Sequence, residues 1–171
     1  MNRRKFLALS GISALGVAVG SAAYRVGAVW WDQEADEAYR VLSPREGEIA
    51  KGIAGALFPG DHLGMPSGTE VGVVSTVDDY LADAPEKTAN LLRLLLHVID
   101  DLGRVADWRM TPFRRRPLEE RVDILQAWET SLIGARREAF TGLKLLFCMG
   151  YCEAPEVIMA AGIDYDCGGW R

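Results

Sequence analysis

Apolar residues recur at intervals of three and four positions over most of the chain between residues 43 and 161. This spacing is that of one face of an α-helix, whereas a half-buried strand would alternate apolar and polar residues. Because helices with one apolar face must bury it against other helices, we predict a single compact all-α domain of about five or six helices.

Capping residues and prolines mark where the helices begin and end. Residues 43–46, Ser-Pro-Arg-Glu, form a capping box with proline at the first helical position, which predicts a helix from there to Pro59. Residues 83–86, Asp-Ala-Pro-Glu, repeat the pattern ahead of the widest apolar face, which we predict to belong to the central core helix. Residues 59–70 hold three glycines and two prolines and are predicted to form a loop. The wide face consists of Leu91, Leu92, Leu95, Leu96, Val98, Ile99 and Leu102.

Other segments also have helical periodicity. The valines at 73, 74 and 77 would suit a strand, but their spacing favours a short helix that ends near Leu81. Residues 118–151 lack proline, and we predict two helices with a break near 131–134, because a single helix would be improbably long. A last short helix is predicted from Pro155, followed by an irregular tail. Residues 103–117 are predicted to be an exposed connection.

The first 28 residues differ from the rest of the chain. They hold four basic residues and no acidic one, and no charge occurs from residue 6 to residue 24. A basic start followed by a weakly apolar stretch is typical of an export signal. Arg3-Arg4-Lys5-Phe6-Leu7 resembles the twin-arginine (Tat) signal, which is read by a translocase. We therefore expect residues 1–28 to be a signal and residues 29–171 to form a helical domain in the periplasm, at the inner membrane.

A retained membrane anchor is the alternative interpretation of the same segment. Small residues at 21–23 and 26–28 offer cleavage sites for a signal peptidase and favour removal. If the segment were retained, Trp30 and Trp31 would lie at the outer membrane interface. In both cases we expect the domain outside the cytoplasm.

The charge of the chain argues against nucleic acid as a partner. Lys and Arg number 19 against 24 Asp and Glu, and no basic stripe provides the footprint that nucleic-acid binding needs. With 49% hydrophobic and 25% charged residues, the composition also excludes a disordered chain and a polytopic membrane protein. The cluster Arg114-Arg115-Arg116 fits a solvated turn or, in an acidic protein, a contact with an acidic partner surface.

The sequence motifs of nucleotide binding and of zinc hydrolysis are absent. We expect His97, inside a Leu-rich helix, to be a hydrogen-bonded side chain or one at the edge of the surface, rather than a catalytic base. His62 beside Asp61 falls short of a metal ligand set, and three cysteines are too few for an iron–sulfur cluster. We therefore assign no catalytic, cofactor-binding or metal-binding residue.

The cysteines fit structural roles in an exported protein. Cys148 and Cys152 lie four residues apart on one predicted helix, and Cys167 lies in the tail. Two thiolates at that spacing could share a metal only with two further ligands. We expect one disulfide, either Cys152 with Cys167 or Cys148 with Cys167, and a third thiol that is free or bonded to another chain.

Several short motifs occur in a fixed order along the chain. They are Arg3-Arg4-Lys5-Phe6-Leu7, Leu57-Phe58-Pro59-Gly60-Asp61, Val71-Gly72-Val73-Val74, Phe113, Glu120-Arg121, Trp128-Glu129, Arg136-Arg137-x-x-Phe140 and Leu145-x-x-x-Met149-Gly150-Tyr151-x-x-x-Pro155. In order and spacing these motifs resemble the gluconate 2-dehydrogenase subunit 3 family, the small Tat-exported subunits of membrane-associated, flavin-dependent sugar and alcohol dehydrogenases. The chain departs from the family's pattern at Cys152, where a second aromatic is common, and in a stretched tail at 162–170.

The resemblance implies a non-catalytic small subunit without a cofactor of its own. FAD and substrate would belong to a large subunit of the glucose–methanol–choline (GMC) type, and electrons would pass to a cytochrome c subunit. The small subunit would serve maturation, stability and Tat export of the large one, which would cross as bound cargo. The alternatives are a stand-alone exported metal or redox protein that uses His62 and the cysteines, and a purely structural membrane anchor.

Large aromatic side chains are candidates for the surface that meets the partner. Trp128 and Tyr151 continue apolar helix stripes, so we expect both in the core. Trp108, Phe113 and Trp170 lie outside the periodic segments, so we expect these three at the partner interface.

Overall fold

The computed structural model describes residues 34–60, 64–105 and 111–163. The chain divides into two units, residues 1–34 and 35–171, and the helices below belong to the second. Within the described residues this unit holds six α-helices, one 3-10 helix and no strand, which confirms the predicted all-α class. In chain order these are α2 (Pro44–Leu57), α3 (Val73–Asp83), α4 (Glu86–Val105), the 3-10 helix η1 (Phe113–Arg115), α5 (Leu118–Glu129), α6 (Gly134–Cys152) and α7 (Pro155–Ala160).

The helix boundaries follow the predicted signals with one exception. At the start of α2 the side chain of Ser43 accepts from the Glu46 N–H, and the Glu46 carboxylate accepts from the Ser43 N–H at 2.9 Å, which completes the predicted capping box. Helices α5 and α6 are separate, as predicted. At 83–86, however, Asp83 is the last residue of α3 rather than a cap for α4, which begins at Glu86. The Asp83 carboxylate instead pairs with Arg40 at 3.3 Å.

Helices α2 and α4 each contact four other elements of the domain. Helix α2 contacts α3, α4, η1 and α5, and eight of its 14 residues are buried. Most of these are Gly or Ala, whose size lets neighbours approach closely; a Cβ on Gly47 would lie 2.6 Å from the Tyr39 ring. Helix α4 contacts α2, α3, η1 and α6, and it buries Leu96 and Ile99 although Leu91 is 66% exposed. Helix α4 is therefore a core helix, as predicted, and it shares the centre of the domain with α2.

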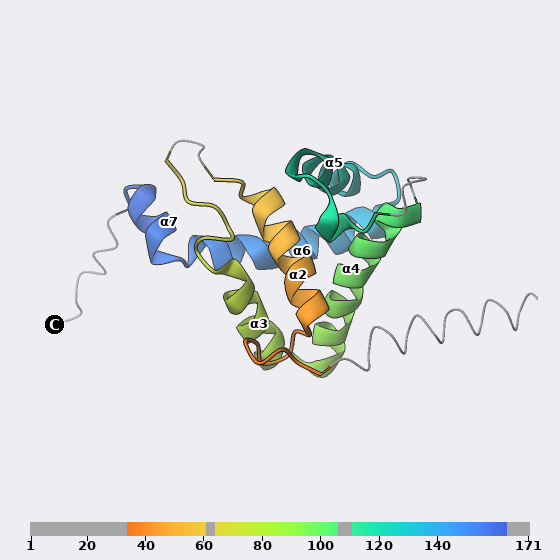
Figure 1. Cartoon of the computed structure of the whole chain (residues 1–171), viewed down its shortest axis with the longest axis horizontal. Helices are drawn as coiled ribbons and strands as arrows, with labels where there is room; N and C mark the ends of the chain where they lie inside the picture. Colours follow the sequence, from red (N-terminus) through yellow and green to blue (C-terminus); the bar gives the residue numbers. More distant parts are fainter. Residues whose placement is uncertain (1–33, 61–63, 106–110, 164–171) are drawn as a thin grey trace, which may run out of the picture. The chain divides into compact units, whose positions relative to one another are not determined.

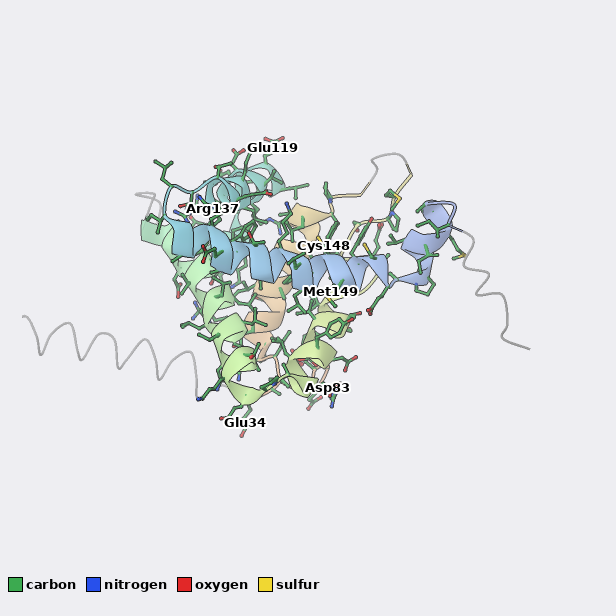
Figure 2. All side chains as sticks on the ribbon, turned by 180° about the vertical axis from the view of Figure 1, so that it is seen from behind. Glu34, Asp83, Glu119, Arg137, Cys148 and Met149 are labelled. Carbon is green, nitrogen blue, oxygen red and sulfur yellow. The ribbon has the colours of Figure 1, made fainter. Side chains whose placement is uncertain are left out.

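Helix α6 crosses the other helices on one side of the domain. Figure 1 shows it passing behind α2, and Figure 2, from the opposite direction, shows it in front. Its inward face carries Phe140, Leu143, Phe147 and Tyr151, all buried. Trp128 of α5 packs against Phe140 with ring centroids 6.4 Å apart. Trp128 and Tyr151 therefore lie in the core, as predicted.

The end of α6 is tied to the loop that follows α2. The Tyr151 ring stacks on Phe58 at a centroid distance of 4.0 Å, and its hydroxyl donates to the Pro66 carbonyl at 2.7 Å. The Gly68 N–H donates to the Phe58 carbonyl at 2.9 Å. A Cβ on Gly68 would lie only 2.7 Å from the Ala54 carbonyl oxygen, so glycine is needed for this close approach.

Phe113 belongs to the core and not to the partner interface. Its side chain is completely buried, and η1, which carries it, contacts α2 and α4. The Phe113 ring comes within 3.4 Å of the position that a Cβ on Gly52 would occupy. The sequence-based expectation for Phe113 is therefore wrong, because a residue outside a helical repeat can still be buried when its segment packs against two helices. Trp108, from the same predicted connection, lies outside the described residues.

Candidate partner-binding surfaces

Glu46 is the centre of a buried charged cluster between α2 and α4. Its side chain is 1% exposed, and its carboxylate accepts from Arg93 Nε at 2.9 Å and from Arg93 Nη2 at 3.0 Å. The same carboxylate lies 3.1 Å from Nε2 of the fully buried His97. His97 is thus a hydrogen-bonded side chain in the interior, as predicted, and the cluster joins two helices that are distant in sequence.

The pKa of Glu46 reflects how completely this carboxylate is compensated. Burial by itself raises its pKa, but hydrogen bonds from His97, Arg93 and Ser43 outweigh burial and lower the pKa from 4.5 to about 2. A catalytic base operates best with a pKa near the working pH. Glu46 is ionised throughout the neutral range, so its position and charge serve the fold.

Asp100 of α4 is a second buried carboxylate. It pairs with Arg45 Nη2 at 3.2 Å and with the guanidinium of Arg114, and it accepts from the Arg114 backbone N–H at 3.1 Å. Arg45 also reaches Asp101 at 3.0 Å. These pairs join the start of α2 to the end of α4 and to η1, and they leave the side chain of Arg114 only 12% exposed.

The three consecutive arginines at 114–116 therefore do not form one solvated cluster. Arg114 points inward to Asp100, and Arg116 donates to the Thr111 carbonyl at 3.2 Å and pairs with Glu120 at 3.1 Å. Arg115 is exposed, and no carboxylate in the part of the chain that the structure describes forms an ion pair with it. Of the three, Arg115 is the one that matches the expectation of a surface cation.

A surface pocket of about 390 Å³ lies between α2, η1 and α5. Four of its lining side chains are cationic and one is anionic. The anion, Glu48, lies 3.2 Å from Arg114 Nε. Within the described ranges this leaves Lys51, Arg115 and Arg121 without a carboxylate partner, and we call the site that they form the cationic pocket. Its complete lining is Glu48, Lys51, Gly52, Thr69, Arg114, Arg115 and Arg121.

Arg121 connects α5 to α2 at the cationic pocket. Its Nη1 donates to the Gly52 carbonyl at 2.9 Å, and a Cβ on Gly52 would lie 3.3 Å from that nitrogen, so the glycine gives the guanidinium access to the backbone. Its Nε is buried and has no hydrogen-bond partner in the described part of the chain. Burial lowers the pKa of Arg121 below its ordinary 12.5. Arg121 is thus a cation that the domain desolvates and only partly compensates.

The outward face of α6 carries an apolar strip, which we call the α6 strip and define as Leu145, Met149 and Cys152. Steps of four and three residues place these side chains on one face of the helix. Leu145 is 59% and Met149 50% exposed, and Cys152 is also exposed. Figure 2 views α6 from this side, with Met149 labelled. The sequence has no ionisable acid or base from 145 to 152 other than the cysteines and Tyr151, so water meets an almost uncharged surface.

Exposed apolar side chains gather around α6. Of the nine large hydrophobic side chains that are exposed in the described residues, six lie between Leu132 and Ile163, and Leu132 is completely exposed. Single exposed apolar residues are normal on a protein surface, but a group of them marks an interaction surface. The sequence contained a signal for this surface. Residues 145–152 place apolar side chains on more of the helix circumference than the one face that packs into the core.

The two cysteines of α6 differ in their surroundings. Cys152 is exposed and Cys148 is half-buried, and both are free thiols within the described residues. Burial, followed by the charge of Cys152, raises the pKa of Cys148 above its ordinary value, so it is a protonated thiol at neutral pH. Cys167 lies outside the described residues. Both predicted disulfide pairings therefore stay predictions.

The remaining predicted residues lie outside the described ranges, so the structure neither supports nor contradicts their roles. In the part of the chain that is described, no group of three His, Cys, Asp or Glu side chains could hold a metal ion. Likewise, none of the helices among these residues has the length and apolar character to span a bilayer. The predicted residues that lie outside the described ranges are Arg3, Arg4, Phe6, Leu7, Trp30, Trp31, Asp61, His62, Trp108, Cys167 and Trp170.

The fold and its surfaces define a class of protein: a small helical domain that uses its buried carboxylates for folding and exposes an apolar strip and a cationic pocket. The chain matches the model of the family described as gluconate 2-dehydrogenase subunit 3 over residues 44–170, and it belongs to that family. The family name denotes a subunit of a dehydrogenase complex. Comparisons with curated proteins and with solved structures found no match.

Proposed function

We propose that this chain is the non-catalytic small subunit of a flavin-dependent dehydrogenase complex, and that it binds and escorts a large, FAD-carrying subunit of the GMC type. The family match over residues 44–170 is the observation that carries the proposal. The non-catalytic role is supported by Glu46 and Asp100, the two least exposed carboxylates among the described residues. Both form ion pairs that hold helices together. In this complex, FAD and the substrate belong to the large subunit, and a cytochrome c subunit receives the electrons.

The α6 strip is the proposed contact surface for the large subunit. Complete burial of a Leu or Met side chain contributes about 1.5–3 kcal/mol. Leu145 and Met149 leave about half of their surface in water, so each has about 1 kcal/mol to contribute to association. The absence of charge along the strip means that a partner can cover it without desolvating an ion.

Export of the complex is the second part of the proposal. The basic start and the twin-arginine pattern at Arg3 and Arg4 support a Tat signal that carries the large subunit as folded cargo to the periplasm. The assembled complex then works at the periplasmic face of the inner membrane. The leader supports this location by its charge pattern alone.

Co-expression tests the escort function. The large subunit is produced with and without this chain, and the flavin content and cellular location of the large subunit are measured. We expect flavin-loaded, exported large subunit only when both chains are present, and no flavin bound to the small subunit alone. A large subunit that is fully loaded with flavin and exported in the absence of this chain would contradict the proposal.

The α6 strip is tested by placing a charge on it. Leu145→Asp together with Met149→Asp is expected to weaken binding of the large subunit at least about tenfold, because two carboxylates would have to be desolvated in the interface. Leu91→Asp, at an exposed apolar residue of α4, is the matched control and should bind like the wild type. Equal binding by the strip variant and the control would exclude the strip as the contact surface.

The signal is tested by a substitution that keeps its charge. Arg3→Lys with Arg4→Lys should abolish export, because a receptor that recognises paired guanidinium groups does not accept ammonium groups in their place. The measurement is the periplasmic yield of the large subunit and of this chain. A normal yield from the double variant would assign the leader to the general secretory route instead.

A further inference from the structure

We propose that the cationic pocket formed by Lys51, Arg115 and Arg121 receives a carboxylate side chain of the large dehydrogenase subunit. This inference rests on the proposed function, which supplies the partner. It adds a second contact surface whose chemistry differs from that of the α6 strip, and it assigns a role to cations that no carboxylate among the described residues neutralises.

The first observation is that three of the four cations in the pocket have no carboxylate partner within the described residues, although Glu48 also lines the pocket. The chain has 24 acidic residues against 19 Lys and Arg, and nearby Arg45, Arg93 and Arg114 each pair with a buried carboxylate. Acidic residues are therefore not scarce. In the described ranges, three cations without one nevertheless line the same pocket, where their mutual repulsion favours an anion.

The second observation is the state of Arg121. Its guanidinium is partly desolvated, one nitrogen donates to the Gly52 carbonyl, and its buried Nε has no hydrogen-bond partner among the described residues. A guanidinium presents a planar set of donors that matches the two oxygens of a carboxylate. A carboxylate in the pocket would therefore supply the negative charge that Arg121 lacks.

The character of the pocket favours a protein carboxylate over a small ligand. Small-molecule sites are mostly apolar and enclose most of their ligand, whereas the cationic pocket opens to solvent and most of its lining residues are charged. A free anion there would compete with water and salt for weakly held contacts. A carboxylate on a partner already held at another surface is presented at a high effective concentration, so the same contacts suffice to bind it.

The two surfaces can be tested separately because they share no residue. The cationic pocket is formed by α2, η1, α5 and the loop residue Thr69, whereas the strip belongs to α6. Figure 1 views the domain from the side of α2, and Figure 2 views it from the side of α6. A large subunit that occupies both surfaces reaches around the small one.

The test measures the affinity of full-length small subunit for the large subunit at low and high salt. Lys51→Glu and Arg115→Glu, each made separately, should weaken binding about tenfold or more at low salt, because the carboxylate of the partner would meet a like charge. The loss should shrink in 0.5 M NaCl, where the screening length is only a few ångströms. Arg115→Gln should lie between Arg115→Glu and the wild type, and thermal unfolding of each variant confirms that it folds.

Lys87→Glu is the matched control. Lys87 is exposed in the first turn of α4 and has no hydrogen-bond or ion-pair partner among the described residues. Its substitution by Glu changes the charge by the same two units. It should bind like the wild type. If Lys87→Glu weakened binding as much as Arg115→Glu, the effect would come from net charge and the pocket assignment would be wrong.

The remaining outcomes separate this inference from the proposed function. If the wild-type chains bind each other and both pocket variants bind equally well, the inference fails and the proposed function stands. If the wild-type chains do not bind each other, both fail. Inorganic phosphate is the probe for a free anion: if phosphate stabilises the wild type but not Arg115→Glu, while both bind the large subunit equally, the pocket is a small-anion site and the inference is overturned.

Discussion

The cations around α2 form two groups that differ in how the domain neutralises them. Arg93 and Arg45 reach the carboxylates of Glu46 and Asp100, which are 1% and 0% exposed. Within the described residues, the cations of the cationic pocket have no such partner. A buried pair that is complete within one chain stabilises the fold, whereas a cation left unpaired beside a pocket is available to another molecule. The first group therefore stabilises the fold, and the second is the group that we propose to bind a partner.

Removal of a paired carboxylate should have the largest effect on stability. Glu46→Ala leaves the guanidinium of Arg93 and the ring of His97 buried without their acceptor, and we expect a loss of about 3–5 kcal/mol in the free energy of unfolding. Chemical denaturation of the full chain measures this loss. Glu48→Ala, at a side chain that is 67% exposed, is the control and should cost less than about 0.5 kcal/mol. Similar losses in both variants would remove the distinction between the groups.

Acid should act through the same carboxylate. The pKa of Glu46 is lowered in the folded domain from 4.5 to about 2, so its contribution is complete above pH 4.5 and is lost as the pH falls through the folded pKa. A shift of this size corresponds to about 3 kcal/mol. The midpoint of urea unfolding, measured from pH 6 to pH 2, should fall mainly below pH 4.5. In Glu46→Gln this part of the pH dependence should be reduced; an unchanged profile would place its origin elsewhere.

A matched pair of arginine substitutions tests whether the two groups of cations differ in their contribution to stability. Arg93→Met should destabilise the domain by about 3 kcal/mol, because it leaves Glu46 buried with one fewer pair. Arg121→Met removes a cation together with its hydrogen bond to the Gly52 carbonyl, and should cost less than about 1 kcal/mol. Both variants are compared by thermal and chemical unfolding of the isolated chain. A larger loss for Arg121→Met would assign Arg121 to the folding group.

The smallest expected effect is at the exposed cation. Arg115→Ala removes a side chain without an ion pair in the described ranges, so stability should change by less than about 0.5 kcal/mol. The same variant should weaken association with the large subunit in low salt. A loss of stability without a loss of association would contradict the proposed role of Arg115 in binding the large subunit.

Much of the secondary structure could be predicted because its signals are local. The capping box at Ser43 and Glu46, the proline-rich loop and the break between α5 and α6 each depend on residues within one or two turns of one another. The burial of Trp128 and Tyr151 followed from the same periodicity. The family resemblance, which depends on the order of short motifs, was equally accessible and is confirmed over residues 44–170.

The cationic pocket and the burial around it could not be predicted in this way because they depend on contacts between distant residues. Arg114 points into the core because it pairs there with the buried Asp100, although the sequence has three identical cations at 114–116. Phe113 is buried because η1 packs against α2 and α4, two helices that precede it in the sequence. Lys51 and Arg121 are 70 residues apart in sequence, from 51 to 121, and line one pocket only after α2 and α5 pack together.

Helix type, most helix limits and the family were thus determined by the sequence alone, since periodicity, capping and motif order depend on neighbouring residues. Only the tertiary structure decided that Asp83 ends α3 rather than caps α4, which of three adjacent arginines is exposed, and where the cations without a carboxylate partner meet. The physical reason is that burial and charge compensation are properties of pairs brought together by packing. A carboxylate such as Asp100 neutralises Arg45 and Arg114 from 55 and 14 residues away.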